Sequence, residues 1–178
     1  MFNVLFHRGE FAQAHEQTRE LIRIGHDSSD SQVRSWGLQT EGELEFVAGQ
    51  LQRSIAHLRE AVQLATAIPD YGTVAEACGD LGRTHLREGN FKQALTSLEE
   101  SNRIIDERGL RSHQLVRPRQ GLAEAYLVAA ERSEGAGRAI TLGKAKRACR
   151  AALKPCKYFC GGFPGAMRLQ GTYEWLTG

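Results

Sequence analysis

Apolar residues recur along this chain at steps of three and four, the spacing that places them on one face of an α-helix. In the stretch 52–65, for example, Ile55, Leu58 and Val62 follow this spacing, and the stretch 91–105 repeats it. No run alternates apolar and polar residues between turn residues, as a half-buried strand would. The pattern predicts nine helices, over residues 1–8, 11–26, 30–48, 51–67, 71–88, 91–108, 113–133, 138–158 and 165–177.

A second regularity is an interval of 40 residues. Glycine recurs at Gly9, Gly49 and Gly89, in the phrases HRGEFAQA, VAGQLQRS and REGNFKQA. Each glycine is followed by a polar residue, then an apolar residue, and a small residue stands five positions after it. A period between 20 and 50 residues is typical of stacked supersecondary units, which bury their apolar faces against their neighbours. The sequence therefore predicts an array of helical repeats.

Another glycine series lies within these units. Gly42 and Gly82 each precede the next of the 40-residue glycines by seven residues, which is about two helical turns. We expect the earlier glycine to lie inside a helix, where the missing side chain lets another helix approach. We expect the later glycine to end that helix in the left-handed conformation, which glycine adopts at little cost. One unit is then a helix, a glycine turn, a second helix and a loop.

The fourth unit departs from this pattern. It keeps Gly121, but Val128 stands where the turn glycine would be, and a longer segment follows. Pro118 is expected to kink or delay the first helix of this unit and so to widen the groove beside it. We expect a single repeat domain, cut from a longer protein, with complete or partial units at 1–28 (partial), 29–68, 69–111, 112–161 and 162–178 (partial).

The unit 69–111 carries a recognisable set of residues: Leu81, Gly82, His85, Gly89, Phe91, Ala94, Leu98 and Ser101. This set resembles the tetratricopeptide repeat, and the resemblance covers essentially the whole chain. It implies an all-α fold, a right-handed α-solenoid of antiparallel helix pairs. The 40-residue interval is longer than the usual 34 of that family. It is similar to the interval in MalT-like and Rap-like bacterial regulators, kinesin light chains and LGN/Pins scaffolds.

Composition and charge restrict the function further. Of 178 residues, 23 are basic and 21 acidic, so the formal net charge is +2, which argues against a dedicated nucleic-acid-binding protein. No apolar run approaches the roughly 20 residues of a membrane-spanning helix, and the N-terminus lacks the features of a secretory signal. The four cysteines do not form the pattern of a disulfide framework. We therefore expect a cytoplasmic protein that does not contact a membrane.

Motifs for catalysis are not found. The six histidines form neither HxxxH nor HExxH, and the sequence has no GxSxG, phosphate loop or GxGxxG. Cys149, Cys156 and Cys160 are expected to share one helix face, either as a metal or redox cluster or as buried small residues. Their spacing is not CxxC and no histidine is near, so burial is favoured. We expect no enzymatic activity, no catalytic residue, no cofactor and no metal.

The predicted helix 138–158 is strongly basic, with Arg138, Lys144, Lys146, Arg147, Arg150, Lys154 and Lys157. Such a helix can bind phosphates or an acidic partner. Its charges can equally form a solvated outer face between core positions such as Ala145, Ala148 and Ala152. The solvated face is the favoured interpretation, and a nucleic acid is not the expected partner.

The family resemblance implies a partner site on the concave face, lined by the first helix of each unit. In that register the groove residues are Gln39, Glu43, Phe46, Asp80, Arg83, Arg87, Arg119, Tyr126, Arg168 and Trp175. Arg83, Arg87 and Arg119 are expected to form a positive stripe suited to carboxylates. The asparagines of the carboxylate-clamp type are absent from their slots, which argues against a receptor for chaperone C-terminal tails.

We therefore interpret the chain as a module that binds a protein or a peptide. The resemblance implies a scaffold that serves as the sensory or regulatory segment of a larger bacterial signalling or transcription protein. The alternative is a structural role, in which exposed terminal helices pack between copies to form a homo-oligomer.

Overall fold

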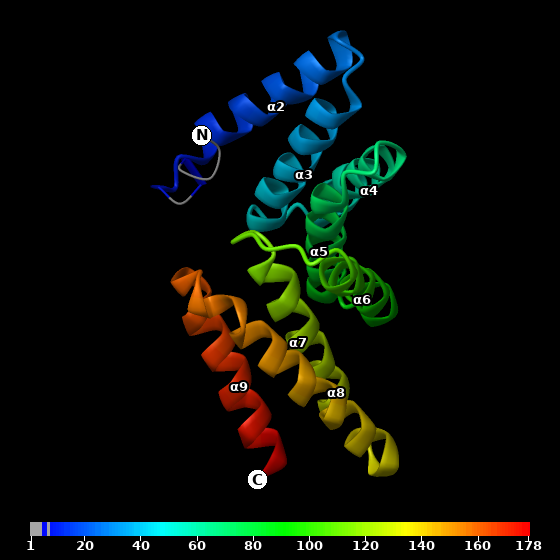
Figure 1. Cartoon of the computed structure of the whole chain (residues 1–178), viewed down its shortest axis with the longest axis vertical. Helices are drawn as coiled ribbons and strands as arrows, with labels where there is room; N and C mark the ends of the chain where they lie inside the picture. The colour runs from blue at the N-terminus through cyan, green and yellow to red at the C-terminus, as the bar shows by residue number, and fades with distance from the viewer. Residues whose placement is uncertain (1–4, 7) are drawn as a thin grey trace.

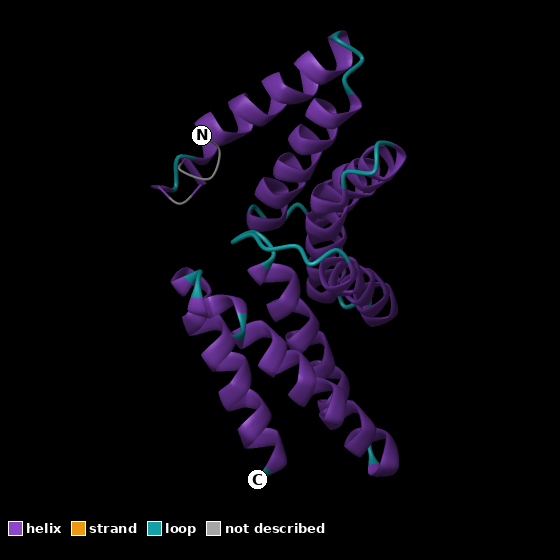
Figure 2. Cartoon of the chain, viewed as in Figure 1, coloured by secondary structure: helices purple, strands orange, loops and turns teal. Residues whose placement is uncertain are grey.

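The computed structural model describes residues 5, 6 and 8–178, which form helices joined by short connections and, within this range, no strand (Figures 1 and 2). The α-helices are α2 (Phe11–Asp27), α3 (Ser31–Val47), α4 (Leu51–Ala67), α5 (Tyr71–Glu88), α6 (Phe91–Glu107), α7 (Val116–Glu131), α8 (Gly135–Leu153) and α9 (Phe163–Thr177). Two short 3₁₀ turns, η1 (Pro155–Lys157) and η2 (Cys160–Gly162), lie between α8 and α9. The helix expected over residues 1–8 lies largely outside the described residues.

Consecutive helices pack against each other, and α3 with α4, α5 with α6, and α7 with α8 form the main pairs (Figure 1). The first helices of successive pairs also touch, since α5 contacts both α3 and α7, and α9 contacts α7. This arrangement confirms the all-α solenoid of helix pairs. It also creates one surface shared by α3, α5 and α7, which positions most of the residues considered below. Among the described helices none is long and apolar enough to cross a membrane.

The two glycine series have the roles that their spacing predicts. Gly9, Gly49 and Gly89 have φ angles of 75°, 77° and 87°, so each adopts the left-handed conformation at a helix end. At Gly82, a Cβ atom would lie only 2.5 Å from Cγ of Leu98 on the paired helix. The missing side chain therefore sets how closely α5 and α6 approach.

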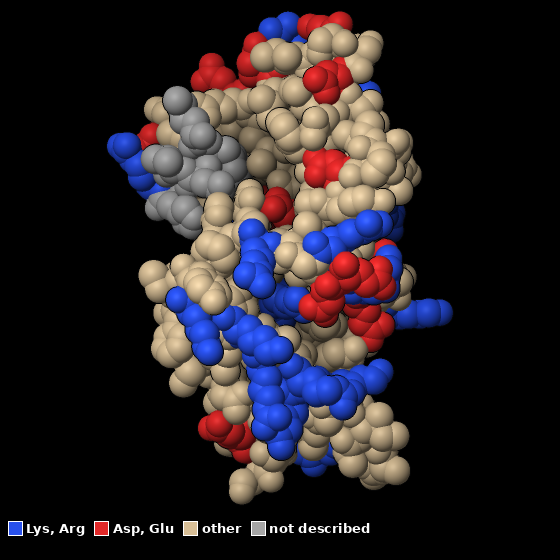
Figure 3. Space-filling view, viewed as in Figure 1, with Lys and Arg blue, Asp and Glu red and all other residues tan. Residues whose placement is uncertain are grey.

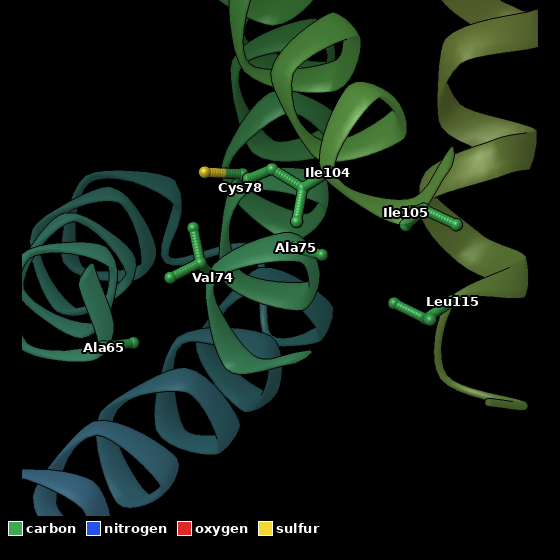
Figure 4. Close-up of a cluster of buried hydrophobic side chains, with 7 residues drawn as sticks. All are labelled: Ala65, Val74, Ala75, Cys78, Ile104, Ile105 and Leu115. Carbon is green, nitrogen blue, oxygen red and sulfur yellow. The ribbon is translucent and has the colours of Figure 1, made fainter. Parts of the chain in front are cut away.

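Buried apolar side chains from several helices form the core. One cluster joins α4, α5, α6 and the segment before α7, and Figure 4 shows its side chains between these elements. It consists of Ala65, Val74, Ala75, Cys78, Ile104, Ile105 and Leu115. Because these residues come from three successive units, no single helix pair could bury them alone, and removing their apolar area from water stabilises the array as a whole.

Pro118 corrects one expectation. It delays α7, which begins at Val116 and so holds Pro118 in its first turn, where a missing backbone N–H costs nothing. It does not widen the groove, however. Pro118 is fully buried, and its Cγ lies 2.3 Å from the position that a Cβ of Gly79 would take. The ring therefore fits against the bare backbone of α5 and draws α5 and α7 together.

The position where α8 ends differs from the expectation. The helix expected over residues 138–158 ends at Leu153, because Pro155 cannot continue it. Cys156 therefore lies in η1 and Cys160 in η2, so the three cysteines do not share one helix face. Cys149 and Cys156 are buried in apolar surroundings, as small core residues, whereas Cys160 is exposed.

Candidate functional site

The surface shared by α3, α5 and α7 contains a buried carboxylate, Asp80. Its side chain is about as buried as the apolar core, at 3% exposure, and it lies on α5. Gln39 of α3 donates a hydrogen bond from Nε2 to Asp80 Oδ2 at 2.9 Å, and Arg83 donates from Nη1 to Oδ1 at 3.0 Å. Burial raises the pKa of Asp80, while the Arg83 charge and these hydrogen bonds oppose that rise. Asp80 thus ties α3 to α5 and fixes the Arg83 guanidinium.

Phe46 and two arginines form an aromatic-cation cluster beside this pair. The guanidinium carbons of Arg83 and Arg87 lie 4.8 Å and 5.2 Å from the centre of the Phe46 ring, within cation–π range. Arg87 also donates from Nη1 to the backbone oxygen of Phe46 at 3.0 Å. Arg87 is exposed and Phe46 is half-buried, so a partner can reach both. We call Phe46, Arg83 and Arg87 the arginine–phenylalanine cluster.

Arg117 belongs to this surface although the sequence analysis did not select it. It forms an ion pair with Glu43, which joins the first turn of α7 to α3, two units away, and Nη2 donates to Oε2 at 2.9 Å. Burial lowers the pKa of Arg117 to about 10, which leaves the guanidinium charged at neutral pH. The signal that could have found it is Gly121, because a residue four positions earlier shares its helix face. Gly121 contacts Arg83, where a Cβ would lie 2.8 Å from Arg83 Cγ.

Glu76 is a carboxyl group of this surface that lacks a partner among the described residues. It precedes Asp80 by four residues on α5, so the two carboxylates share one helix face. Among the described residues it has neither a hydrogen bond nor an ion pair. Burial, with the charges of Asp80 and Asp70, raises the pKa of Glu76 to about 8.

Arg119 lies elsewhere, against α6. It donates to both carboxylate oxygens of Asp106, at 2.6 Å and 3.2 Å, and to Oδ1 of Asn102 at 3.2 Å. The expected stripe of Arg83, Arg87 and Arg119 therefore does not form. The physical reason is the rotation of the helix, since Arg119 stands two positions before Gly121 and therefore lies on the other side of α7.

Tyr126, Arg168 and Trp175 also lie away from the arginine–phenylalanine cluster. Tyr126 donates its hydroxyl to Glu99 of α6 at 2.5 Å, and burial raises its pKa. Arg168 of α9 lies 3.5 Å from the Glu124 carboxylate of α7. Trp175 is 77% exposed near the end of α9. The structure thus brings together six of the ten expected residues, on α3 and α5.

Comparison with known proteins identifies the architecture. A family model described as tetratricopeptide repeat matches residues 38–107, which run from within α3 to the end of α6. Residues 38–107 therefore form tetratricopeptide repeats. Such repeats generally mediate contacts between proteins, and the fold is typically a non-catalytic scaffold. A search of curated proteins gave no match.

Solved structures extend the likeness of fold beyond the matched repeats. Two crystal structures of nearly identical TPR-like repeats, from a putative kinesin light chain of Podosopora anserina, align with almost the whole chain. The first has a TM-score of 0.59 at 17% identity and covers 97% of this chain and 92% of the other. The second has a TM-score of 0.54 at 16% identity, with 95% and 91% covered. At this identity the likeness concerns the fold.

The tetratricopeptide motif residues occupy the packing positions that the repeat requires. His85 fills the aromatic slot of α5 and is buried, which lowers its pKa. Ala94 and Ser101 of α6 are fully buried, and the Ser101 hydroxyl donates to the backbone oxygen of Ala75. These small residues let the two helices of the repeat approach closely.

Proposed function

We propose that the chain binds an extended segment of a partner protein along the surface shared by α3, α5 and α7. The observation that carries this proposal is the arginine–phenylalanine cluster, which offers a cation and an aromatic ring to solvent on a rigid frame. Arginine and aromatic residues dominate the binding energy of protein interfaces. Asp80 and Gln39 hold Arg83 in place beforehand, so little conformational freedom is lost on binding.

The charges along α5 suggest what kind of segment would fit. Glu76, Asp80, Arg83 and Arg87 follow one another at steps of four, three and four, so they form one stripe along the helix. Asp80 and Arg83 neutralise each other, which leaves the unpaired carboxyl group of Glu76 and the cation of Arg87, about 16 Å apart along the axis. A basic residue placed against Glu76 would favour the ionised form of its carboxyl group. A segment with a basic residue at one end and an acidic residue at the other would complement both.

This proposal can be tested with peptides selected from a random display library against the whole chain. The test variant Phe46→Ala with Arg87→Glu removes the exposed part of the cluster and leaves the Asp80 network intact. A matched control is Tyr71→Ala with Arg108→Glu, because Arg108 lies 3.8 Å above the exposed Tyr71 ring at the other end of α5. We expect the selected peptides to lose at least tenfold in affinity with the first variant and to keep it with the second. Peptides equally insensitive to both variants would refute this surface as the site.

We further propose that this binding regulates a larger signalling or transcription protein of a bacterium, in which the repeats are the sensory segment. The support is the 40-residue interval and its similarity to the repeats of bacterial regulators. In a host that encodes the protein, the Phe46/Arg87 variant should alter the regulated output, whereas the Tyr71/Arg108 variant should not. Unchanged output with both would argue against the regulatory role.

Self-association is the second candidate, and the outer face of α9 favours it. Phe163, Met167 and Trp175 lie at steps of four and eight along the helix and are 51%, 46% and 77% exposed. Exposed apolar residues in line are typical of a contact surface. Light scattering over a range of concentrations separates the candidates. A dimer that Met167→Glu with Trp175→Glu dissociates would favour self-association, whereas a monomer leaves α9 uncovered and favours a foreign partner.

A further inference from the structure

A second hollow surface lies between α6 and α8. Its main cavity has a volume of about 580 Å³ and an apolar floor that includes Ile105, Leu110 and Leu115, with Pro155 and Tyr158 on the α8 side. A smaller hollow of about 250 Å³ continues it along α8. Asp106, Arg119 and Ala151 line both, so the two form one groove. We call it the α6–α8 groove. Its size suits a few side chains of a ligand.

Cations line this groove without a carboxylate partner. Lys144, Arg147 and Lys154 are exposed and, with Ala151, follow one another at steps of three and four along α8, so all four point to the same side. Arg111 adds a further exposed cation from the loop. Within the described part of the chain none of these four cations (Lys144, Arg147, Lys154 and Arg111) has an ion pair. Lys144 instead lies 5.5 Å from the centre of the Tyr126 ring.

Arginines on other helices, in contrast, form ion pairs on the surface. Arg23 on α2 is held by acidic residues three and four positions away on the same helix, and Arg103 on α6 is held likewise. Helix α8, in contrast, contains no acidic residue at all. Figure 3 shows the result, a broad gathering of Lys and Arg where Figure 1 places α7 and α8.

One carboxylate does line the groove, and it is already neutralised. Asp106 accepts two hydrogen bonds from Arg119, so it leaves the positive charge of the walls in excess. The groove therefore combines a nearly apolar floor with walls that attract anions. A helix face that is merely solvated would need neither a cavity nor an excess of positive charge. The combination therefore points to a binding site.

We propose that the α6–α8 groove binds an acidic segment of a partner protein. An apolar side chain of that segment fills the cavity over Leu110 and Leu115, and its neighbouring carboxylates pair with Arg147 and Lys154. Tyr126, Tyr158 and Phe159 also line the groove, but its floor of Ile105, Leu110 and Leu115 suits an apolar side chain. The near-neutral net charge of +2 also favours a peptide over a nucleic acid as the partner. This site uses Arg119 of α7 with residues of α6 and α8 and no residue of the arginine–phenylalanine cluster, so it stands whether or not that cluster binds a partner.

The test uses the whole chain and three fluorescent probes in anisotropy titrations. The first probe is a short peptide of alternating glutamate and leucine, the second replaces each glutamate by lysine, and the third is a single-stranded oligo-dT. The groove variant is Arg147→Glu with Lys154→Glu. The matched control is Lys146→Glu with Lys157→Glu, which changes the net charge equally at exposed positions that do not line the groove. Circular dichroism checks that each variant keeps its helicity.

A third variant separates shape from charge. Ala151→Phe fills the groove, since Ala151 lines both hollows, and it leaves every charge in place. We expect the acidic peptide to bind saturably, to lose at least tenfold in affinity with the groove variant and with Ala151→Phe, and to change less than about threefold with the control. The lysine peptide should not bind.

Three results would overturn the proposal. The first is no saturable binding of the acidic peptide. The second is an equal loss with the groove variant and the control, or no effect of Ala151→Phe, because either would mean diffuse attraction to net charge. The third is tighter binding of oligo-dT than of the peptide with the same dependence on the variants, because the groove would then be a nucleic-acid site.

Discussion

Two glycines of the same series should respond in opposite ways to the same substitution. Gly82 and Gly171 both stand inside the first helix of their units, and each precedes a further glycine, Gly89 or Gly178, by seven residues. In the structure, a Cβ at Gly82 would lie 2.5 Å from Cγ of Leu98 and 3.0 Å from the backbone oxygen of Ala94. A Cβ at Gly171 would meet no atom within 4 Å. We predict that Gly82→Ala destabilises the protein and that Gly171→Ala stabilises it.

The magnitudes follow from two opposing terms. Alanine inside a helix is more favourable than glycine by about 1 kcal/mol, because it restricts the unfolded chain. Gly171→Ala should gain most of this amount. At Gly82, Leu98 is fully buried and its Cγ cannot move away as a flexible tip would, so α5 and α6 must separate. Overpacking costs about 1–3 kcal/mol, and the contacts of 2.5 Å and 3.0 Å place Gly82→Ala in the upper part of that range, at about 2–3 kcal/mol. Subtracting the gain of alanine leaves a net loss of about 1–2 kcal/mol.

Urea denaturation followed by circular dichroism measures both changes in the free energy of unfolding. For a chain of this length each kcal/mol also moves the melting temperature by about 2–4 °C. A control is Gly82→Ala in a Leu98→Ala background, where the added methyl group has room and its penalty should disappear. Unchanged or higher stability of Gly82→Ala alone would refute the packing of α5 on α6 as described. A loss with Gly171→Ala would show that the outer face of α9 is covered, for instance by a second copy.

Three further substitutions test other parts of the structure. Burial raises the pKa of Glu76 from 4.5 to about 8, so the folded protein favours the protonated carboxyl group. The stability that this preference gives is complete below about pH 4.5 and is lost as the pH rises through 8. Glu76→Gln should therefore stabilise the protein by roughly 4 kcal/mol at pH 8.5 and by under about 1 kcal/mol at pH 5, in urea titrations at both values. A gain independent of pH would contradict this. Arg117→Gln should cost about 3 kcal/mol, since it leaves the Glu43 carboxylate buried without its cation, and adding Glu43→Gln should recover much of the loss in a double-mutant cycle. Ala94→Leu should destabilise the array by about 1–3 kcal/mol, whereas Ala56→Leu at an exposed site of α4 should change stability by no more than about 0.5 kcal/mol; equal effects would show that the repeat register is wrong.

The repeat architecture could be predicted from the sequence because it depends on local rules. The turn glycines need only a backbone conformation that other residues avoid, and the small residues at positions such as Ala94 need only a helix nearby. Because these residue types recur every 40 positions, the repeat can be recognised in the sequence. They fail where the unit changes, since the end of α8 at Leu153 follows from Pro155 rather than from the apolar pattern.

The candidate site could be predicted only in part, because it depends on how helices are rotated against one another. The expected positions on α3 and α5 do lie together, since the register of a regular unit fixes which residues face inward. On α7 the expected residue was Arg119, but Arg117 faces α3. Two features set the rotation of α7: the helix begins late, at Val116, and Pro118 packs against Gly79. Neither feature follows from the family register.

This rotation makes the first turn of α7 the junction between the two proposed binding surfaces. Arg117 reaches Glu43 on one side, Arg119 reaches Asp106 on the other, and the buried Pro118 between them is held by α5. Because the three residues are consecutive in one rigid turn, neither arginine can change partner by a turn of the helix without displacing the other. A carboxylate in the α6–α8 groove can still compete with Asp106 for Arg119 by side-chain motion alone. The two surfaces can therefore be occupied independently as long as this turn of α7 keeps its place.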